Sequence, residues 1–145
     1  MWANDKARRP IRLLGIMVLA ITLAACGGAG DATPTDGTKN AAGYRDISVE
    51  QLAGMLETQD VTLVNVHVPY EGEIPQTDLF IPYDEIENHL GELPDKEAPI
   101  VLYCRSGSMS TAAAEVLAAQ GYQNVMELDG GFNAWRGAGH ELLNR

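Results

Sequence analysis

Hydrophobic residues follow three different patterns along the chain. Residues 13–25 (LLGIMVLAITLAA) are apolar or small apart from Thr22. Residues 27–43 are rich in Gly, Ala, Thr and Asp and show no apolar periodicity. From Tyr44 onward, short β-branched or apolar runs alternate with stretches of helical periodicity. This last pattern predicts an α/β domain with a mostly parallel sheet.

The part of the chain after Tyr44 can be divided into individual elements. Ser48-Val49-Glu50-Gln51 has the form of a capping box and predicts a helix to about Thr58, with apolar residues on one face. Near-continuous apolar runs predict buried strands. The expected strands are residues 61–66, 79–81, 99–103 and 124–128, and the further helices are 84–90, about 109–120 and 132–136. Gly121 and the Gly130-Gly131 pair supply a helix stop and a sharp turn.

The first 25 residues have the features of an export signal. Four basic side chains precede an apolar run of residues 13–25, which is too short to span a bilayer. The run ends in Leu23-Ala24-Ala25-Cys26, which resembles the lipobox of bacterial lipoproteins. This resemblance implies a signal peptide at 1–25, acyl chains such as palmitate on Cys26, and a flexible tether at 26–43. The alternatives are an ordinary secretory cleavage site and an uncleaved anchor.

Such a protein would lie in the cell envelope, lipid-anchored on the outer side of the cytoplasmic membrane or in the periplasm or outer membrane. The chain has 145 residues, of which 46% are hydrophobic, and a formal net charge of −10. One domain with a packed core fits this length. A polyanion is bound by basic patches, so this acidity argues against nucleic acid as a partner. The oligomeric state is not predicted.

The candidate chemistry lies in the cysteine loop, residues 104–110 (CRSGSMS). Cys104 follows a buried strand and precedes a helix, and reactive groups of open α/β sheets gather at that edge. Loop amides and the helix N-terminus favour a thiolate there. Gly107 allows the loop to wrap around one atom, and hydroxyl donors are available from Ser106, Ser108, Ser110 and Thr111.

The cysteine loop, Cys104-Arg105-Ser106-Gly107-Ser108-Met109-Ser110, resembles the active-site loop of the rhodanese family. A second stretch, residues 128–135 (LDGGFNAW) followed by Gly137-Ala138-Gly139, resembles the closing element of that domain. The likeness covers roughly residues 44–143 of a domain predicted at 44–145, and it implies a five-stranded, mostly parallel sheet with helices on both faces. It also implies that Cys104 accepts a sulfane sulfur as a persulfide, stabilised by main-chain amides of residues 105–110. The donor would be thiosulfate or another persulfide, and the acceptor a thiol or cyanide. No metal or organic cofactor is implied.

The chain departs from the family pattern at three positions. Asn65 stands where aspartate is common, which removes a charge that could accept hydrogen bonds from the cysteine loop. His67 stands where arginine is common, which weakens a fixed ion pair or offers a proton shuttle. Met109 stands where thiosulfate-using members often carry a basic residue, so we expect thiosulfate to be a poor donor.

Other functions compete with sulfur transfer. Tyrosine phosphatases and arsenate reductases need an arginine six residues after the cysteine, and this chain has Ser110 there. A carrier, redox sensor or interaction module on the same scaffold remains open, as does a purely structural role for Cys104 as a small buried residue. Arg105 is expected to be solvated, paired with a carboxylate or turned to an anionic substrate, and Trp135 to lie in the core.

Overall fold

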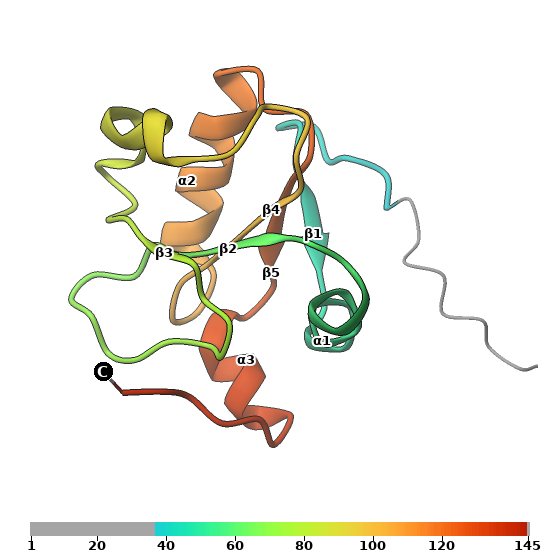
Figure 1. The fold of residues 1–145 in the computed structure, drawn as a ribbon, viewed down its shortest axis with the longest axis vertical. Helices are drawn as coiled ribbons and strands as arrows, with labels where there is room; N and C mark the ends of the chain where they lie inside the picture. Colours follow the sequence, from blue (N-terminus) through green and yellow to red (C-terminus); the bar gives the residue numbers. More distant parts are fainter. Residues whose placement is uncertain (1–36, 145) are drawn as a thin grey trace, which may run out of the picture. The chain divides into compact units, whose positions relative to one another are not determined.

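A computed structural model describes residues 37–144 of the chain. These residues form a five-stranded sheet in the order β1-β5-β4-β2-β3, in which every neighbouring pair is parallel (Figure 1). The strands are β1 (Arg45–Ile47), β2 (Thr62–Asn65), β3 (Leu79–Phe80), β4 (Ile100–Tyr103) and β5 (Val125–Leu128). The helices are α1 (Val49–Thr58), η1 (Ile86–Glu92), α2 (Ser108–Ala119) and α3 (Gly131–Gly137). The predicted α/β fold is therefore confirmed, with a sheet that is parallel throughout.

Two apolar clusters cover the two faces of the sheet. Helix α2 and η1 pack on one face, and α1 and α3 on the other (Figure 1). Side chains of a strand alternate between faces, so Ile100 and Leu102 of β4 point toward α2, while Val101 and Tyr103 point toward α1 and α3. Trp135 is buried in the second cluster, as expected. The central strands β4 and β5 are buried along their whole length, which explains the continuous apolar sequence of β4 and the apolar residues on either side of Glu127 in β5.

Helix α1 begins with the predicted capping box. The Gln51 N–H donates to the Ser48 side chain, and the Ser48 N–H donates to the Gln51 side chain. The face of α1 that carries Val49, Leu52 and Met55 is buried. Local sequence signals therefore set both the start and the orientation of this helix.

The segment predicted as a helix over 84–90 is instead the 3₁₀ segment η1. Its backbone leaves helical geometry at His89 (φ −112°, ψ 17°). The bonds Glu85 N–H to Pro82 C=O and Asn88 N–H to Glu85 C=O have i to i+3 spacing. A run this short has few residues over which to offset helix nucleation, and the tighter 3₁₀ form suits brief connections.

Several sequence predictions fall outside residues 37–144. The signal peptide at 1–25, Cys26 and the tether as far as residue 36 are not among the described residues. The end of the predicted tether is described: the Gly43 N–H donates to the Asn40 C=O, and the Asn40 N–H to the Tyr44 C=O, so this end forms a turn against β1. Among residues 37–144, the helices are all too short or too polar to cross a bilayer.

Candidate active site

The Cys104 side chain lies at the carboxyl end of β4, on the α2 face of the sheet. It continues the alternation of Ile100 and Leu102 and belongs to the same apolar cluster. The residue is only 2% exposed. Strand β4 is central, with β2 on one side and β5 on the other, so the sulfur sits at the edge where parallel strands present reactive groups.

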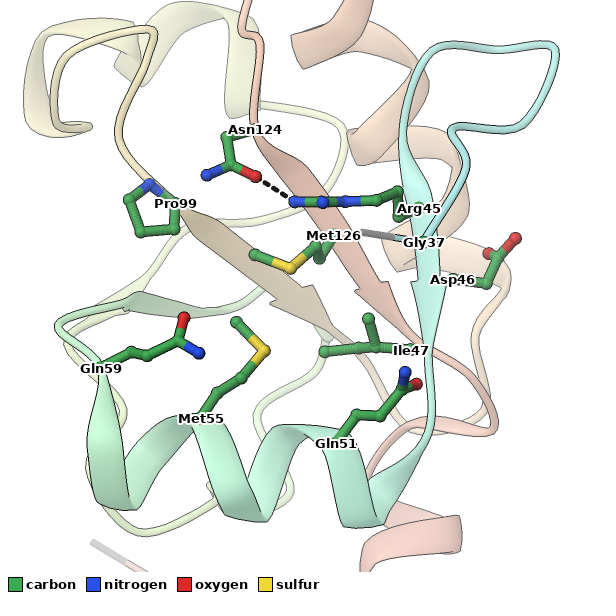
Figure 2. Close-up of a pocket in the computed structure, with 10 residues that line it drawn as sticks. All are labelled: Gly37, Arg45, Asp46, Ile47, Gln51, Met55, Gln59, Pro99, Asn124 and Met126. Carbon is green, nitrogen blue, oxygen red and sulfur yellow. Dashed lines mark hydrogen bonds between the residues drawn. The ribbon is translucent and has the colours of Figure 1, made fainter. Parts of the chain in front are cut away.

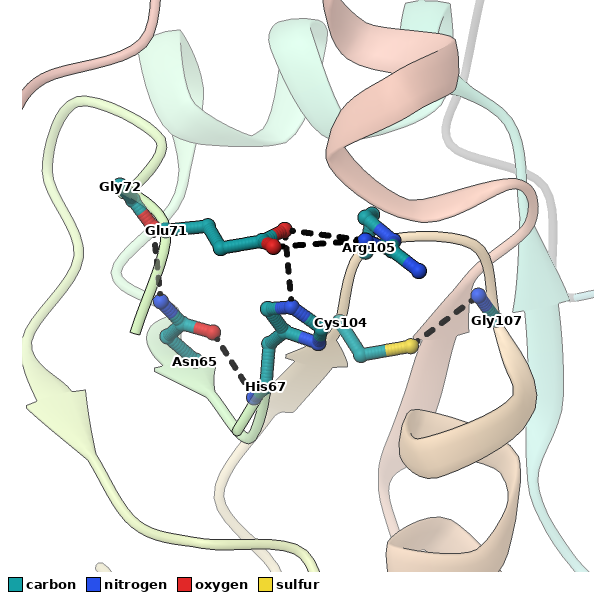
Figure 3. A network of polar contacts seen from close by, with 7 residues as sticks. All are labelled: Asn65, His67, Glu71, Gly72, Cys104, Arg105 and Gly107. Atoms are coloured by element: carbon teal, nitrogen blue, oxygen red, sulfur yellow. Dashed lines mark hydrogen bonds and ion pairs between the residues drawn. The ribbon is translucent and has the colours of Figure 1, made fainter. Parts of the chain in front are cut away.

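Hydrogen-bond donors converge on the Cys104 sulfur. The Gly107 N–H donates to Sγ at 3.1 Å, drawn as a dashed line in Figure 3, and the Ser110 hydroxyl lies 3.4 Å from Sγ. The loop can close this tightly because Gly107 has a φ of +107°, a backbone conformation that residues with a Cβ rarely adopt. The arrangement favours a negatively charged sulfur.

Helix α3 holds the carbonyl groups of the cysteine loop away from the sulfur. The Phe132 N–H donates to the Cys104 C=O at 2.9 Å, and the Asn133 N–H donates to the Arg105 C=O at 3.0 Å. The first N–H groups of a helix have no partner within the helix, and here the loop carbonyls satisfy two of them. The loop amides are thereby left to face Sγ. This contact gives the second sequence signature, residues 128–135, its structural role.

Two opposing effects set the pKa of the Cys104 thiol. Burial raises the pKa, because the charged form loses solvation. The Ser110 hydroxyl and the backbone amides of Ser110, Ser106 and Gly107 lower it, and together they outweigh burial. The pKa of Cys104 therefore lies below its ordinary value, which increases the thiolate population at neutral pH.

A polar network borders the cysteine loop at the end of β2 (Figure 3). His67 Nε2 lies 3.1 Å from a Glu71 carboxylate oxygen. The same carboxylate contacts Arg105 of the cysteine loop at 3.3 and 3.4 Å. The His67 ring is buried and packs edge-on against Phe132, with a centroid distance of 5.4 Å. Glu71 therefore links the β2 end to the cysteine loop.

The fully buried side chain of Asn65 organises the loop after β2. Its amide group donates to the Gly72 C=O at 3.0 Å, and its oxygen accepts from the His67 N–H at 3.0 Å. An ionised aspartate could not donate the first of these bonds. The sequence predicted that Asn65 removes a charge that could accept hydrogen bonds from the cysteine loop; in the structure its two hydrogen bonds hold its own loop in place.

The family assignment follows from a comparison with known proteins. A family model described as "Rhodanese-like domain" matches residues 48–138. The chain belongs to the rhodanese-like domain family. The match spans all the elements just described from α1 to α3, including both sequence signatures.

Curated and solved relatives of this rhodanese-like domain agree with the match. A sulfurtransferase of Allochromatium vinosum is 40% identical over 94 residues, covering 62% of this chain and 86% of the relative. A thiosulfate sulfurtransferase GlpE of Pseudoalteromonas translucida is 31% identical over 105 residues, covering 70% and 98%. A crystal structure of a rhodanese-like domain protein from Staphylococcus aureus is 30% identical, covers 70% of this chain and 100% of its own, and has a TM-score of 0.59.

The rhodanese-like domain places the residues predicted for the cysteine loop in different environments. Ser110 is buried and reaches the sulfur. Ser106 and Ser108 are exposed, and Met109 is partly buried against the α2-side cluster. The Thr111 N–H donates to the Gly107 C=O. Of the four residues predicted to offer hydroxyl donors, Ser110 is the one whose hydroxyl contacts Sγ within residues 37–144. The other donors to the sulfur are backbone amides.

A buried acid that the sequence pattern did not indicate lies next to Ser110. Glu127 of β5 is 3% exposed, and its Oε1 lies 2.5 Å from the Ser110 hydroxyl oxygen. Burial raises the pKa of Glu127 to about 7; the nearby charges of Asp46 and Asp129 also raise it, against a lowering effect of the Ser110 hydrogen bond. The sequence does contain one signal for Glu127: the residue lies in a run predicted to be a buried strand, and a buried acid needs a specific hydrogen-bonding partner.

A cavity of about 260 Å³ lies elsewhere in the domain (Figure 2). It is lined by residues of β1, α1 and the segments that precede β4 and β5, among them Arg45, Gln51, Pro99 and Asn124. Pro99 and Asn124 precede strands that run toward the cysteine loop, so this cavity is at the opposite end of the sheet from Cys104. It is separate from the sulfur chemistry.

Proposed function

We propose that this protein is a sulfurtransferase that moves a sulfane sulfur through a persulfide on Cys104. The observation that carries the proposal is the convergence of the Gly107 N–H and the Ser110 hydroxyl on Sγ, while the loop carbonyls bind α3. Donors that point inward stabilise an anionic sulfur before, during and after transfer. The names of the curated relatives as sulfurtransferases support the same reaction class.

The reaction consists of two displacements. The Cys104 thiolate attacks the outer sulfur of a donor, the bond from that sulfur to the rest of the donor breaks, and the donor remnant leaves with the electron pair. The remnant is sulfite if the donor is thiosulfate, and a thiolate if the donor is a persulfide. An acceptor thiolate or cyanide then attacks the outer sulfur of the Cys104 persulfide and releases the Cys104 thiolate. Covalent catalysis thus replaces one difficult transfer by two.

The charges around the loop favour a persulfide donor over the dianion thiosulfate. Arg105, the cation of the cysteine loop, is already paired with the Glu71 carboxylate. Met109 has an uncharged thioether at the position where a second cation would help to bind a dianion. The relatives named as thiosulfate sulfurtransferases are 30–31% identical, which leaves room for a different donor. The same features support the second candidate, a persulfide carrier that is loaded but turns over slowly.

Loading and turnover separate these possibilities. Purified protein incubated with polysulfide should gain about 32 Da, the mass of one sulfur atom, and peptide mapping should place the gain on Cys104. Thiosulfate should load the same site more slowly. Rapid transfer of that sulfur to cyanide or a thiol identifies an enzyme, whereas loading without turnover identifies a carrier. Absence of any gain with either donor would refute the sulfur-transfer proposal.

We also propose that the chain is exported and anchored in the cell envelope through lipid on Cys26, on the outer side of the cytoplasmic membrane or in the periplasm or outer membrane. Support comes from the sequence alone: the basic start, the short apolar run of residues 13–25 and the Leu23-Ala24-Ala25-Cys26 ending.

A clickable palmitate analogue supplied to expressing bacteria tests the anchor. The wild-type chain should incorporate the label and partition into detergent, and the Cys26→Ser chain should do neither. Cys104→Ser is the matched control, since it removes the other cysteine of the chain and should keep the label. An unlabelled wild-type chain would refute the anchor.

A further inference from the structure

We propose that Glu127 is a positioning residue that, through the Ser110 hydroxyl, controls whether Cys104 can hold a negative charge. The inference deepens the proposed function and rests on it for its catalytic meaning. Glu127 comes from β5, Ser110 from α2 and Cys104 from β4, so three separate elements bring the three side chains together. Glu127 and Ser110 are both buried, and Cys104 is 2% exposed.

The Ser110 hydroxyl has one hydrogen and three neighbouring acceptors. Its oxygen lies 2.5 Å from Glu127 Oε1, 3.0 Å from the Gly107 C=O and 3.4 Å from Cys104 Sγ. A hydroxyl donates one hydrogen bond and accepts two. If Glu127 is ionised, the short contact takes the hydrogen, and the sulfur loses its hydroxyl donor. If Glu127 is protonated, it donates to Ser110, and the Ser110 hydrogen is free to turn to the Gly107 C=O or, once the thiol ionises, to the charged sulfur.

The 2.5 Å contact identifies the Glu127 side as the dominant one. O–H···O bonds of this length involve a shared or charge-assisted hydrogen and are stronger than neutral ones. The 3.4 Å O–H···S contact is weaker, so it is lost when the two acceptors compete for the hydrogen. The charge on Glu127 therefore decides whether the Ser110 hydrogen is available to the sulfur.

The surroundings of Glu127 make two simultaneous charges unfavourable. Asp46, its register partner on β1, and Asp129, which follows β5, are both acids that raise the pKa of Glu127. On the other side lie Ser110, the Gly107 backbone and the Cys104 sulfur. A thiolate would add a further negative charge across a buried hydroxyl. Cys104 and Glu127 should therefore titrate as a coupled pair that most readily carries one negative charge.

This coupling gives a specific order of events with pH. Burial raises the pKa of Glu127 to about 7, so below that pH the carboxyl is neutral and Ser110 is free to stabilise the thiolate. Above it, the carboxylate withdraws the hydroxyl and repels the sulfur, and the pKa of Cys104 should rise. Loading Cys104 with an anionic persulfide should in turn favour the protonated form of Glu127.

The test is the pH profile of Cys104 alkylation by iodoacetamide, resolved by peptide mass spectrometry in the full chain. In Glu127→Gln the side-chain amide can donate to Ser110 at every pH and carries no charge. The midpoint of the Cys104 alkylation profile should therefore fall by about one pH unit, and the profile should become a single step. The variant removes a buried charge and is expected to fold. Glu115→Gln is the matched control, because it removes an exposed carboxylate from α2 and should leave the midpoint unchanged.

Ser110→Ala distinguishes the hydroxyl route from simple charge repulsion. This variant should raise the Cys104 midpoint, and in the double variant the effect of Glu127→Gln should be less than half of its effect in wild type. An unchanged or raised midpoint in Glu127→Gln overturns the proposal. An equal shift with and without Ser110 also overturns it, since the charge would then act directly. Thiol titration needs no sulfur donor, so failure of the sulfur-transfer proposal would be seen separately, in the loading assay.

Discussion

Replacing Cys104 by serine should lower the rate of sulfur transfer by at least about 10³-fold while the domain stays folded. The reason is chemical: a hydroxyl stays protonated at neutral pH and is a weak nucleophile without an adjacent base. The geometry is retained, because a serine oxygen can still accept from the Gly107 N–H, which now lies 3.1 Å from Sγ. The stability cost should be about 1 kcal/mol, for a hydroxyl in a site that packs against apolar residues.

Steady-state transfer to cyanide and intact mass after polysulfide treatment measure this effect. Cys26→Ser provides the matched control, because it changes the other cysteine of the chain to the same residue, and it should load and transfer as wild type does. Persistence of the roughly 32 Da gain in Cys104→Ser would show that another group accepts the sulfur.

Replacing Gly131 by alanine should both destabilise the domain and displace the backbone of the cysteine loop. Gly131 has a φ of +56°, a conformation that costs residues with a Cβ about 1–2 kcal/mol. A Cβ there would collide with the Cys104 carbonyl oxygen and would lie 2.7 and 2.8 Å from the Arg105 C and O atoms. These atoms belong to the backbone and cannot rotate away as a side chain could. We expect a total loss of about 3 kcal/mol and much slower sulfur loading.

Gly137→Ala is the control for this prediction, since it makes the same change at the other end of α3. A Cβ at Gly137 meets no atom within 4 Å, and stability should stay the same or rise by up to about 1 kcal/mol. Urea unfolding of both variants, followed by intact-mass analysis after polysulfide treatment, makes the comparison. Equal stability and equal loading of the two variants would show that α3 does not hold the loop.

The parts of the site that sequence predicts correctly are those that local residues determine. The place of Cys104 follows from a buried strand, a glycine that permits a left-handed backbone and a helix, all within one short stretch. The capping box of Ser48 and Gln51 is local in the same way. Such features need no knowledge of what packs against them.

The contacts that sequence missed depend on residues far apart in the chain. Glu127 matters because α2 places Ser110 next to it, and the two residues are 17 positions apart. Glu71 contacts Arg105 across 34 positions. Neither separation produces a periodic pattern. Asn65 is a different case: its residue type stands out in the sequence, but its partner, the Gly72 carbonyl, belongs to a loop whose path the sequence does not specify.

Helix α3 belongs to one apolar layer, while the Cys104 side chain belongs to the other. The reactive cysteine is thus held by its carbonyl from one side of the sheet and by its side chain from the other. Separation of either layer releases one of these two attachments. Heat inactivation of the domain should therefore coincide with global unfolding, because no smaller cooperative unit contains the whole site.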